Sequence, residues 1–262
     1  MKKLIYLIMI ITLYHLIPTN PCYSQDTLWT RTYGGPNWDD PSDILIIDDG
    51  GYMIAGDNDV YDGYIVRTDS LGNNIWTSTF GGNGFQALTG ICRHDNDFFL
   101  SGGSGVDFFS PTDGWLVCIS NNGDSLWSKT YGGEDDDGFT SMAATGDGGY
   151  ILAGFTHSYG QGDDDWYLVK TDSLGDTIWT RTYGSPHFDA CYALQETSDG
   201  GYIMGGMCAN GAYIVKTDAQ GELTWDDRDD GLTYTMYKEV KQTDDGGYIA
   251  VGIAHADGGE QL

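Results

Sequence analysis

A unit of about fifty residues recurs along almost the whole chain, and this repeat limits the possible folds more than any other feature of the sequence. A tryptophan returns at steps of 46 to 52 residues, and the tetrapeptide Asp-Gly-Gly-Tyr returns in the same phase. Two independent landmarks with one period indicate a stacked or radial repeat architecture. The tryptophans are Trp29, Trp76, Trp127, Trp179 and Trp225; the tetrapeptides begin at Asp49, Asp147, Asp199 and Asp245, and the stretch from Asp95 to Phe98 is a degenerate copy.

Each repeat has the pattern of four short strands. Apolar and polar residues alternate over segments that are too short for helices, and this alternation is typical of β-strands. Gly50 and Gly72 stand in predicted tight turns, where glycine supplies the positive φ angle. In the first complete repeat the predicted strands are residues 44–47, 52–56, 64–68 and 75–80.

Four antiparallel strands in each unit of about fifty residues describe the blade of a β-propeller. We therefore predict an all-β fold, a β-propeller of four-stranded blades with four full blades and a partial fifth, in an incomplete or open ring. An array of β-sandwiches is the alternative, although such arrays repeat less faithfully at this length. The propeller domain is expected over residues 25–262, with units at about 38–82, 83–133, 134–185, 186–230 and 231–262, the last of them partial.

The two ends of the repeat region do not complement each other. Residues 28–33 have the pattern of a lone fourth strand, whereas the last unit stops after its second strand, residues 248–252. An N-terminal strand often completes the final blade of a propeller, but here a third strand would still be missing. Because open sheet edges are a liability, we expect the natural chain to continue beyond Leu262; the alternative is an open arc with an exposed edge.

The N-terminus has the features of a secretory signal peptide. Lys2 and Lys3 precede an apolar run, residues 4–17, that is too short to span a bilayer comfortably. We predict cleavage after about residue 24 and a secreted or cell-surface protein. Without residues 1–24 the chain has 10 basic and 39 acidic residues, a net charge of −29, which repels nucleic acids and anionic membranes. The expected partners are extracellular glycans or proteins.

Two runs of acidic residues lie in predicted loops. Hard cations favour oxygen ligands, so a calcium site is one interpretation of these runs. Charge runs usually face water, and neither run has the spacing of an EF-hand, so solvated loops are the other interpretation. No other cofactor is expected. The candidate metal ligands are Asp135, Asp136, Asp137, Asp163, Asp164 and Asp165.

Four cysteines remain after signal cleavage, in an exported chain that can form disulfides. If the hairpin turns at Asp199-Gly200, Cys191 and Cys208 face each other on neighbouring strands, and we predict a disulfide between them. Cys92 and Cys118 fall on the first and third strands of another unit and are expected to be buried free thiols.

The repeat resembles known propeller families. Asp-Gly-Gly-Tyr-Ile followed by Lys-Thr-Asp-x-x-Gly-x-x-x-Trp, as in residues 147–179, resembles the repeat of large exported bacterial β-propeller proteins. Residues 171–179 also resemble the tryptophan-docking motif of quinoprotein-like propellers, in which Gly-x-x-x-Trp packs blade on blade. They are similar to the Asp box of sialidase-like and xyloglucanase-like propellers, with one extra residue on each side of the glycine.

Aromatic residues divide into those that follow the repeat and those that do not. The recurring tryptophans Trp76, Trp127, Trp179 and Trp225 are predicted to be structural and to bury area between blades, because a binding residue need not recur in every unit. Loop aromatics outside the repeat are candidates for binding sugar rings beside carboxylates, the alternative being simple anchoring of their loops. They are Trp38, Phe85, Phe108, Phe109, Tyr159 and Phe188.

No set of catalytic residues can be assigned from the sequence. A glycosidase needs two carboxylates at a set separation, and 39 acidic residues do not single out a pair. Adjacent cysteines, a P-loop and a serine or cysteine nucleophile motif are also absent from the sequence. The first hypothesis is a non-catalytic exported module that binds or adheres to a glycan or another extracellular polymer. The alternatives are a propeller-type glycoside hydrolase, endoglucanase-like or xyloglucanase-like, and a lectin-like carbohydrate-binding protein.

Overall fold

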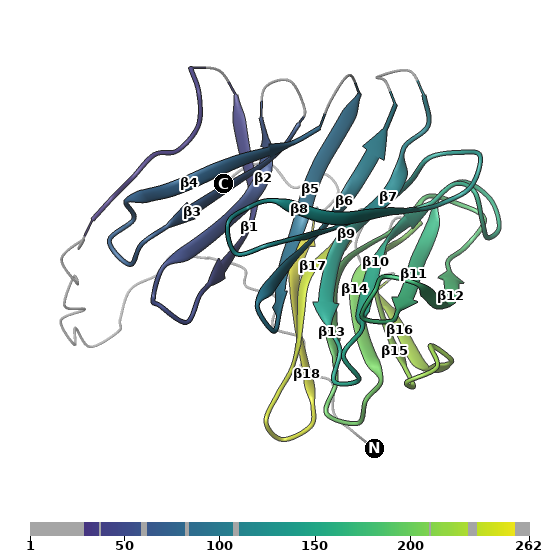
Figure 1. Cartoon of the computed structure of the whole chain (residues 1–262). Coiled ribbons are helices and arrows are strands. Elements are labelled where there is room, and N and C mark those ends of the chain that lie inside the picture. Colours follow the sequence, from purple (N-terminus) through teal and green to yellow (C-terminus); the bar gives the residue numbers. More distant parts are fainter. Residues whose placement is uncertain are drawn as a thin grey trace, which may run out of the picture.

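The computed structural model describes residues 29–36, 38–58, 62–81, 84–106, 110–209, 211–229 and 235–254 (Figure 1). These residues form β-strands and no helix, which confirms the all-β prediction. Within the same ranges there is accordingly no helix long and apolar enough to cross a membrane. The predicted signal peptide, residues 1–24, and the loop aromatics Phe108 and Phe109 lie outside the described residues.

The strands group into four antiparallel sheets of four and one sheet of two, and each sheet is a run of consecutive strands. The first two sheets are β1 (Asp39–Ile46), β2 (Tyr52–Asn58), β3 (Gly63–Thr68) and β4 (Asn74–Phe80), then β5 (Phe85–His94), β6 (Asp97–Gly105), β7 (Asp113–Ile119) and β8 (Ser125–Tyr131). The next two are β9 (Asp137–Ala144), β10 (Tyr150–Thr156), β11 (Asp165–Thr171) and β12 (Thr177–Tyr183), then β13 (Asp189–Glu196), β14 (Tyr202–Cys208), β15 (Gly211–Thr217) and β16 (Leu223–Asp229). The last sheet contains β17 (Thr235–Gln242) and β18 (Tyr248–Ala254). Four full blades and a partial fifth are therefore present, as predicted.

The geometry of the turn between the first two strands of a blade explains why the Asp-Gly-Gly motif recurs. In the third blade Gly148 has a φ angle of 88°, which favours glycine. Gly149 donates its N–H to Asp147 Oδ1 at 3.1 Å, and a Cβ on Gly149 would overlap the carbonyl oxygen of Thr171 on the third strand. The first glycine is thus required by the backbone angle and the second by the close approach of β11.

The aspartate of this turn also pairs with a buried base on the third strand. Lys170 Nζ lies 2.9 Å from Asp147, and Lys216 Nζ lies 3.1 Å from Asp199. Arg67 contacts Asp49 in the first blade in the same way. Each lysine also donates to the carbonyl of the following threonine, so the pair ties the turn to the third strand. This pair was not predicted from the sequence.

The apolar core lies between blades. Leu116 and Cys118 of the second blade pack against Leu152 and Val169 of the third in one buried cluster. The tryptophan of each outer strand is half-buried, and in the third and fourth blades its ring lies near the second-strand tyrosine of the next sheet. Its ring centroid lies 6.0 Å from that of Tyr202 for Trp179 and 5.5 Å from that of Tyr248 for Trp225. Trp76 and Trp127 pack against the corresponding clusters of their own junctions.

The predicted Cys191–Cys208 disulfide is wrong, because both cysteines are free. Cys191 faces Gly206 and Cys208 faces Asp189. The hairpin pairs Glu196 with Tyr202, and a bulge between Cys191 and Ala193 shifts the register once more. Burial raises the pKa of Cys191 to about 12, so the thiol stays protonated at neutral pH.

Cys92 and Cys118 lie on β5 and β7 with β6 between them, and both are free, as expected. Cys118 is buried and Cys92 is mostly buried.

Residues 29–33 lie where the outer strand of a preceding blade would lie, but they form no strand of a described sheet. Trp29 lies 5.8 Å from Tyr52, ring to ring, and Tyr33 Oη donates to the carbonyl oxygen of Gly72 at 2.7 Å. Tyr131 Oη makes the same bond to Gly175 at 2.7 Å. The segment therefore contacts the first blade as β8 contacts the third.

Candidate functional site

One end of the blades carries the longer loops. Because consecutive strands are antiparallel, the loop after each outer strand and the loop between each second and third strand lie at the same end. We call this end the loop face; its described loops include residues 34–36, 132–136, 157–164 and 184–188. The opposite end carries the tight glycine turns. Most loop aromatics and acid runs singled out in the sequence are on the loop face.

Three aromatic side chains are exposed there. Trp38 is 85% exposed, Tyr159 46% and Phe188 45%. Trp38 and Phe188 hold the same repeat position, since each directly precedes the first aspartate of a blade. Tyr159 is fixed by a 2.6 Å hydrogen bond from its Oη to the carbonyl oxygen of Gly132. Phe85 instead begins β5 and is partly buried.

The first aspartate of a blade shapes the loop before it. Asp39 accepts the N–H of Gly35 at 2.8 Å, and Asp137 accepts that of Gly133 at 2.8 Å. Asp189 accepts the N–H of Ser185 in the same manner. Each bond closes a short loop that leaves the intervening residues facing outward, which explains why Trp38 and Phe188 are exposed.

Two pairs of carboxylates meet at consecutive blade junctions. Asp113 and Asp137 converge over Gly132, where a Cβ would collide with both. Burial, and then the charge of Asp137, raise the pKa of Asp113 above its ordinary value. Asp165 and Asp189 converge over Gly184 in the same way, and burial raises the pKa of Asp165. The pair belongs to the repeat and not to a single blade.

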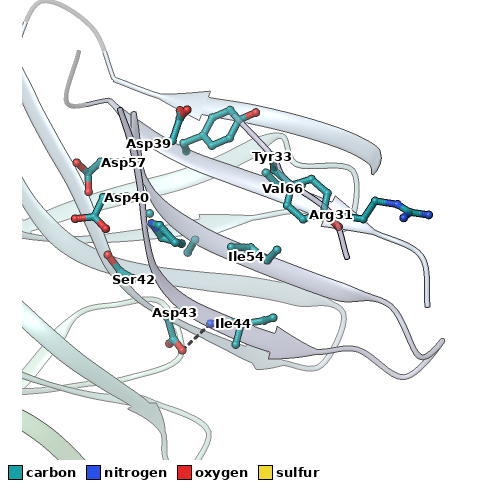
Figure 2. Close-up of a pocket in the computed structure, with 14 residues that line it drawn as sticks. Arg31, Tyr33, Asp39, Asp40, Ser42, Asp43, Ile44, Ile54, Asp57 and Val66 are labelled. Atoms are coloured by element: carbon teal, nitrogen blue, oxygen red, sulfur yellow. Dashed lines mark hydrogen bonds between the residues drawn. The ribbon is translucent and has the colours of Figure 1, made fainter. Parts of the chain in front are cut away.

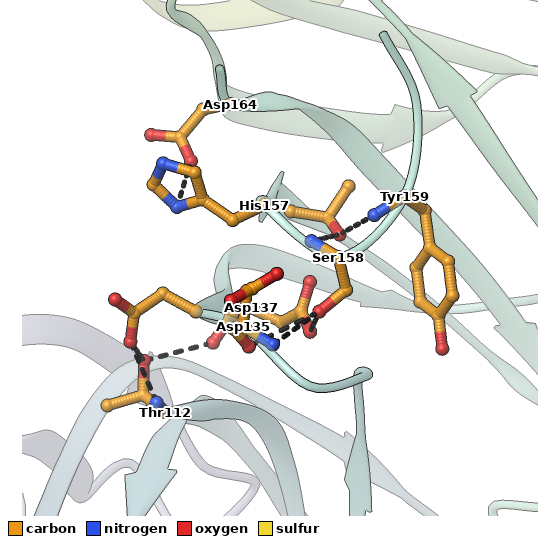
Figure 3. Close-up of polar contacts among 9 residues, drawn as sticks. Thr112, Asp135, Asp137, His157, Ser158, Tyr159 and Asp164 are labelled. Carbon is orange, nitrogen blue, oxygen red and sulfur yellow. Dashed lines mark hydrogen bonds and ion pairs between the residues drawn. The ribbon is translucent and has the colours of Figure 1, made fainter. Parts of the chain in front are cut away.

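Asp137 differs from Asp189 in one respect. Its Oδ2 accepts hydrogen bonds from Gly133 and from Ser158 Oγ at 2.7 Å, but its buried Oδ1 has no partner in the described structure (Figure 3). The matching Oδ1 of Asp189 accepts the N–H of Ala209 at 2.6 Å. In the third blade the corresponding N–H, that of His157, donates to the Asp136 carbonyl instead. Asp137 Oδ1 is therefore left for a cation or a water molecule.

The six acids proposed as metal ligands do not converge as a set. Asp136 accepts two hydrogen bonds from Thr112, the closer at 2.8 Å, and Asp164 contacts His157 Nδ1 at 2.7 Å (Figure 3). Asp163 is exposed. Asp135 is exposed as well, and its backbone N–H donates to Ser158 Oγ. Among the described residues, no group of three or more His, Cys, Asp or Glu side chains is arranged to hold a metal. The pair that sequence reasoning missed is Asp113 with Asp137.

A pocket of about 540 Å³ opens on the first blade (Figure 2). Its floor is aliphatic, with Ile44, Ile54 and Val66, and Asp40 and Asp57 stand toward its loop-face end. Burial, and then the charge of Asp40, raise the pKa of Asp57. The floor residues hold the positions that pack against the preceding blade in the other sheets. The pocket is thus half of a blade junction.

The arrangement of strands has clear counterparts among solved structures. The WD40 domain of Pan2 from Neurospora crassa matches with a TM-score of 0.51 at 12% identity, over 81% of this chain and 60% of that domain. An endo-arabinase from Bacteroides thetaiotaomicron matches with a TM-score of 0.51 at 12% identity, over 85% of this chain and 96% of the enzyme. The fold is that of a β-propeller.

These similarities establish the fold alone, because the identities are low. This chain spans less than two thirds of the length of the Pan2 domain that it matches. No model of a protein family and no curated protein sequence matches the chain.

Proposed function

We propose that this protein is a non-catalytic, exported binding module whose loop face binds a glycan or another extracellular polymer. The observation that carries the proposal is the exposure of Trp38, Tyr159 and Phe188 on the loop face, where Trp38 and Phe188 each directly precede an aspartate in the sequence. Flat aromatic rings stack on the apolar faces of sugars, and carboxylates accept hydrogen bonds from sugar hydroxyls. A lectin-like protein is one form of this function.

The negative net charge of the chain favours neutral ligands over polyanionic ones. A net charge of −27 disfavours nucleic acids and other polyanions, whereas neutral polysaccharides are not repelled. Export through the N-terminal signal sequence would place the protein where such polymers occur. Exported bacterial propellers with a similar repeat support this assignment.

Hydrolysis is the second candidate, and Asp113 with Asp137 is the pair that favours it. A raised pKa on one carboxyl beside a second carboxylate is what a glycosidase needs. However, Asp137 is fully buried, and the pair recurs as Asp165 and Asp189 at the next junction. A catalytic pair need not recur, so binding is the better supported function.

Calcium belongs to this proposal as a structural ion at the loop face. Asp137 Oδ1 is buried without a donor in the described structure, and the other oxygen of the same carboxylate converges with Asp113 over Gly132. Hard cations favour such oxygen pairs, completed by carbonyl oxygens or water. Bound there, the ion would join the second blade to the third and fix the loop that carries Tyr159.

A glycan array with the mature chain, followed by titration of the best ligand, tests the proposal. We expect Trp38→Ala and Phe188→Ala each to weaken binding about tenfold, as the loss of a stacking ring does. Leu71→Ala is the matched control, because Leu71 is exposed in a turn at the opposite end of the blades. Unchanged binding in both aromatic variants would refute the loop face as the site. Release of reducing sugar that Asp113→Asn abolishes would establish the hydrolase instead.

A further inference from the structure

One tripeptide, Asp-(Ser/Thr)-(Leu/Ile), occurs at two different positions of the repeat. It begins at Asp69 and Asp172 in the turn between the third and outer strands, and at Asp124 and Asp176 directly before the outer strand. A further copy, residues 26–28, lies outside the described residues. Every Asp-Ser and Asp-Thr pair in the sequence belongs to one of these copies. A motif that served only the fold would keep one place in the repeat.

The aspartates of the four described copies have different structural roles. Asp172 closes its turn by accepting the N–H of Leu174 at 2.9 Å, and Asp69 does the same in the first blade. Asp176 instead forms an ion pair with a lysine of the preceding blade at 2.5 Å. The side chain of Asp124 forms no hydrogen bond or ion pair with a described residue. Local structure therefore does not explain why an aspartate begins every copy.

The second and third residues of each copy face solvent. The four hydroxyl side chains are exposed, and within the described ranges none of them forms a hydrogen bond. The aliphatic side chains that follow are between 52% and 63% exposed. Neither burial nor hydrogen bonding explains why these residue types recur. The hydroxyl residues are Ser70, Ser125, Ser173 and Thr177, and the aliphatic residues are Leu71, Leu126, Leu174 and Ile178.

All four copies lie at the end of the blades opposite the loop face. The turn after the third strand and the start of the outer strand meet at this end, because consecutive strands are antiparallel. Among the described strands, each outer strand pairs on one edge only, so both positions are accessible to another protein. The tripeptide thus has the placement of a sequence that an enzyme recognises on the folded chain.

We propose that Asp-(Ser/Thr)-(Leu/Ile) is an acceptor motif for O-linked glycosylation. The hydroxyl oxygen attacks the anomeric carbon of an activated sugar phosphate donor. A glycosidic bond forms as the bond between that carbon and the phosphate oxygen breaks, the phosphate leaves, and the hydroxyl proton passes to a base of the transferase. The transferase recognises the aspartate by its charge and the aliphatic side chain by apolar contact. The acceptor residues are Ser70, Ser125, Ser173 and Thr177.

The charge of the chain favours a sugar over a phosphoryl group on these hydroxyls. Phosphorylation would add about 1.5–2 negative charges beside each aspartate. The chain already has a net charge of −27. A neutral saccharide adds no charge, and its bulk covers the exposed aliphatic side chains and shields the free edges of the outer strands. The loop face at the other end stays accessible, so the proposal does not depend on what that face binds.

Peptide mapping of the chain purified from the organism that produces it tests the acceptor sites. Trypsin releases residues 171–181, which contain Ser173, Thr177 and the exposed Thr180, a threonine without a preceding aspartate. We expect electron-transfer fragmentation to locate a saccharide on Ser173 and on Thr177 and none on Thr180. An unmodified peptide, equal modification of Thr180, or the mass of phosphate in place of a saccharide would overturn the proposal.

Variants produced in the same organism separate the motif from simple exposure. Asp124→Asn should remove the glycan from Ser125 and leave Ser173 modified, because the Asp124 side chain has no structural partner among the described residues. Ser125 modified as before in this variant contradicts the role of the aspartate.

A motif built at a new position gives the converse test. In the fourth blade, Asp218 is followed by alanine and glutamine in the turn, so Ala219→Ser combined with Gln220→Leu completes the tripeptide and should add one glycan. In the second blade, Asn121→Ser combined with Asn122→Leu puts the same two residues into the matching turn after Ser120, without the aspartate, and should add none. No added glycan in the first double variant, or an added glycan in the second, contradicts the proposal.

Discussion

The junction between the third and fourth blades and the outward face of the first blade are built from the same repeat positions, yet only the junction is filled. Leu194 of the fourth blade is 6% exposed, whereas Ile44, its counterpart in the first blade, is 58% exposed. The aromatic contact of the outer segment is present in both places: Trp179 with Tyr202 at 6.0 Å and Trp29 with Tyr52 at 5.8 Å. Among the described residues, only this outer segment covers the first blade's outward face, and the other strands of a preceding blade are not present.

This difference shows which properties are local and which depend on neighbours. Strands, turns and the turn-to-base ion pair form in the first blade as in the third, so they follow from each repeat alone. Burial of the apolar face of a sheet needs a neighbouring blade. The 540 Å³ pocket on the first blade is accordingly explained by repeat geometry without any ligand.

The largest difference between the two regions is expected in the free energy of unfolding when the matched residues Leu194 and Ile44 are each replaced by alanine. Leu194→Ala removes a buried side chain and should lower the free energy of unfolding by about 3 kcal/mol. Ile44→Ala should cost less than about 1 kcal/mol, because its side chain is already exposed. Urea unfolding of the two variants measures both values. Equal costs would mean that the outward face is covered in solution.

Replacing the two matched tryptophans, Trp179 and Trp29, should give a smaller difference in the free energy of unfolding than the aliphatic pair does. Trp179 packs against the cluster between the third and fourth blades, and we expect Trp179→Ala to cost about 3 kcal/mol, the low end for a tryptophan, because the ring is half-buried. Among the described residues, Trp29 packs on the first blade and on no second blade, so Trp29→Ala should cost roughly half as much. Thermal unfolding of the two variants measures the loss of stability in each. A larger loss for Trp29→Ala than for Trp179→Ala would contradict the account.

Much of this organisation could be predicted from the sequence, because the relevant signals repeat. The positions of Trp179 and Asp199 gave the period, and the glycine after Asp199 gave the turn. The ion pair between Asp199 and Lys216 could have been found from the same data, since both residues recur in phase.

Other features have no residue type that marks them. The hairpin pairs Glu196 with Tyr202, which already places Cys191 out of register with Cys208, and the bulge at Tyr192 shifts the register further. The same bulge recurs in the first strand of every sheet, although a different residue type can occupy it. In the acid run, Asp137 is buried and Asp135 is exposed because β9 begins at Asp137. Because consecutive aspartates do not show where the strand begins, the pairing of Asp137 with Asp113 could not be predicted from the sequence.

The carboxylate pair makes a prediction about pH and calcium. The folded pKa of Asp113 is raised, so its contribution to stability is greatest below about pH 4 and is lost as the pH rises through that raised value. At neutral pH, calcium should offset the repulsion, and millimolar calcium chloride should raise the melting temperature by about 2–4 °C, as roughly 1 kcal/mol of linkage does.

Asp113→Asn should remove both the calcium effect and this pH dependence. Asp165→Asn is the matched control at the next junction and should keep the calcium effect, because Asp189 Oδ1 already has the Ala209 donor. A melting temperature that does not respond to calcium or to its removal by chelation would mean that the pair only shares a proton.

The smallest expected effect concerns the turn-to-base pair. A hydrogen bond from Thr197, opposed by burial and aided by Lys216, lowers the pKa of Asp199 to about 2. Its contribution to stability is present above about pH 4 and is lost as the pH falls toward 2. Lys216→Met should flatten the acid limb of a stability–pH curve slightly, since solvent screens the exposed carboxylate. Lys241→Met, which breaks an exposed pair with Glu239, should leave that limb unchanged.

Hydrogen exchange at β18 and β14 is the most direct test of the central claim. The claim is that neighbouring strands and blades, and not the repeat sequence itself, decide which backbone amides are protected from exchange. The two strands share the Tyr-Ile start and the preceding Asp-Gly-Gly turn, but among the described strands β14 is paired on both edges and β18 on one. Mass spectrometry of peptides covering residues 248–254 and 202–208 measures both. We expect about half of the β18 amides to exchange at least roughly 100-fold faster than those of β14, because their N–H groups have no partner strand. Protection of β18 equal to that of β14 would contradict the claim.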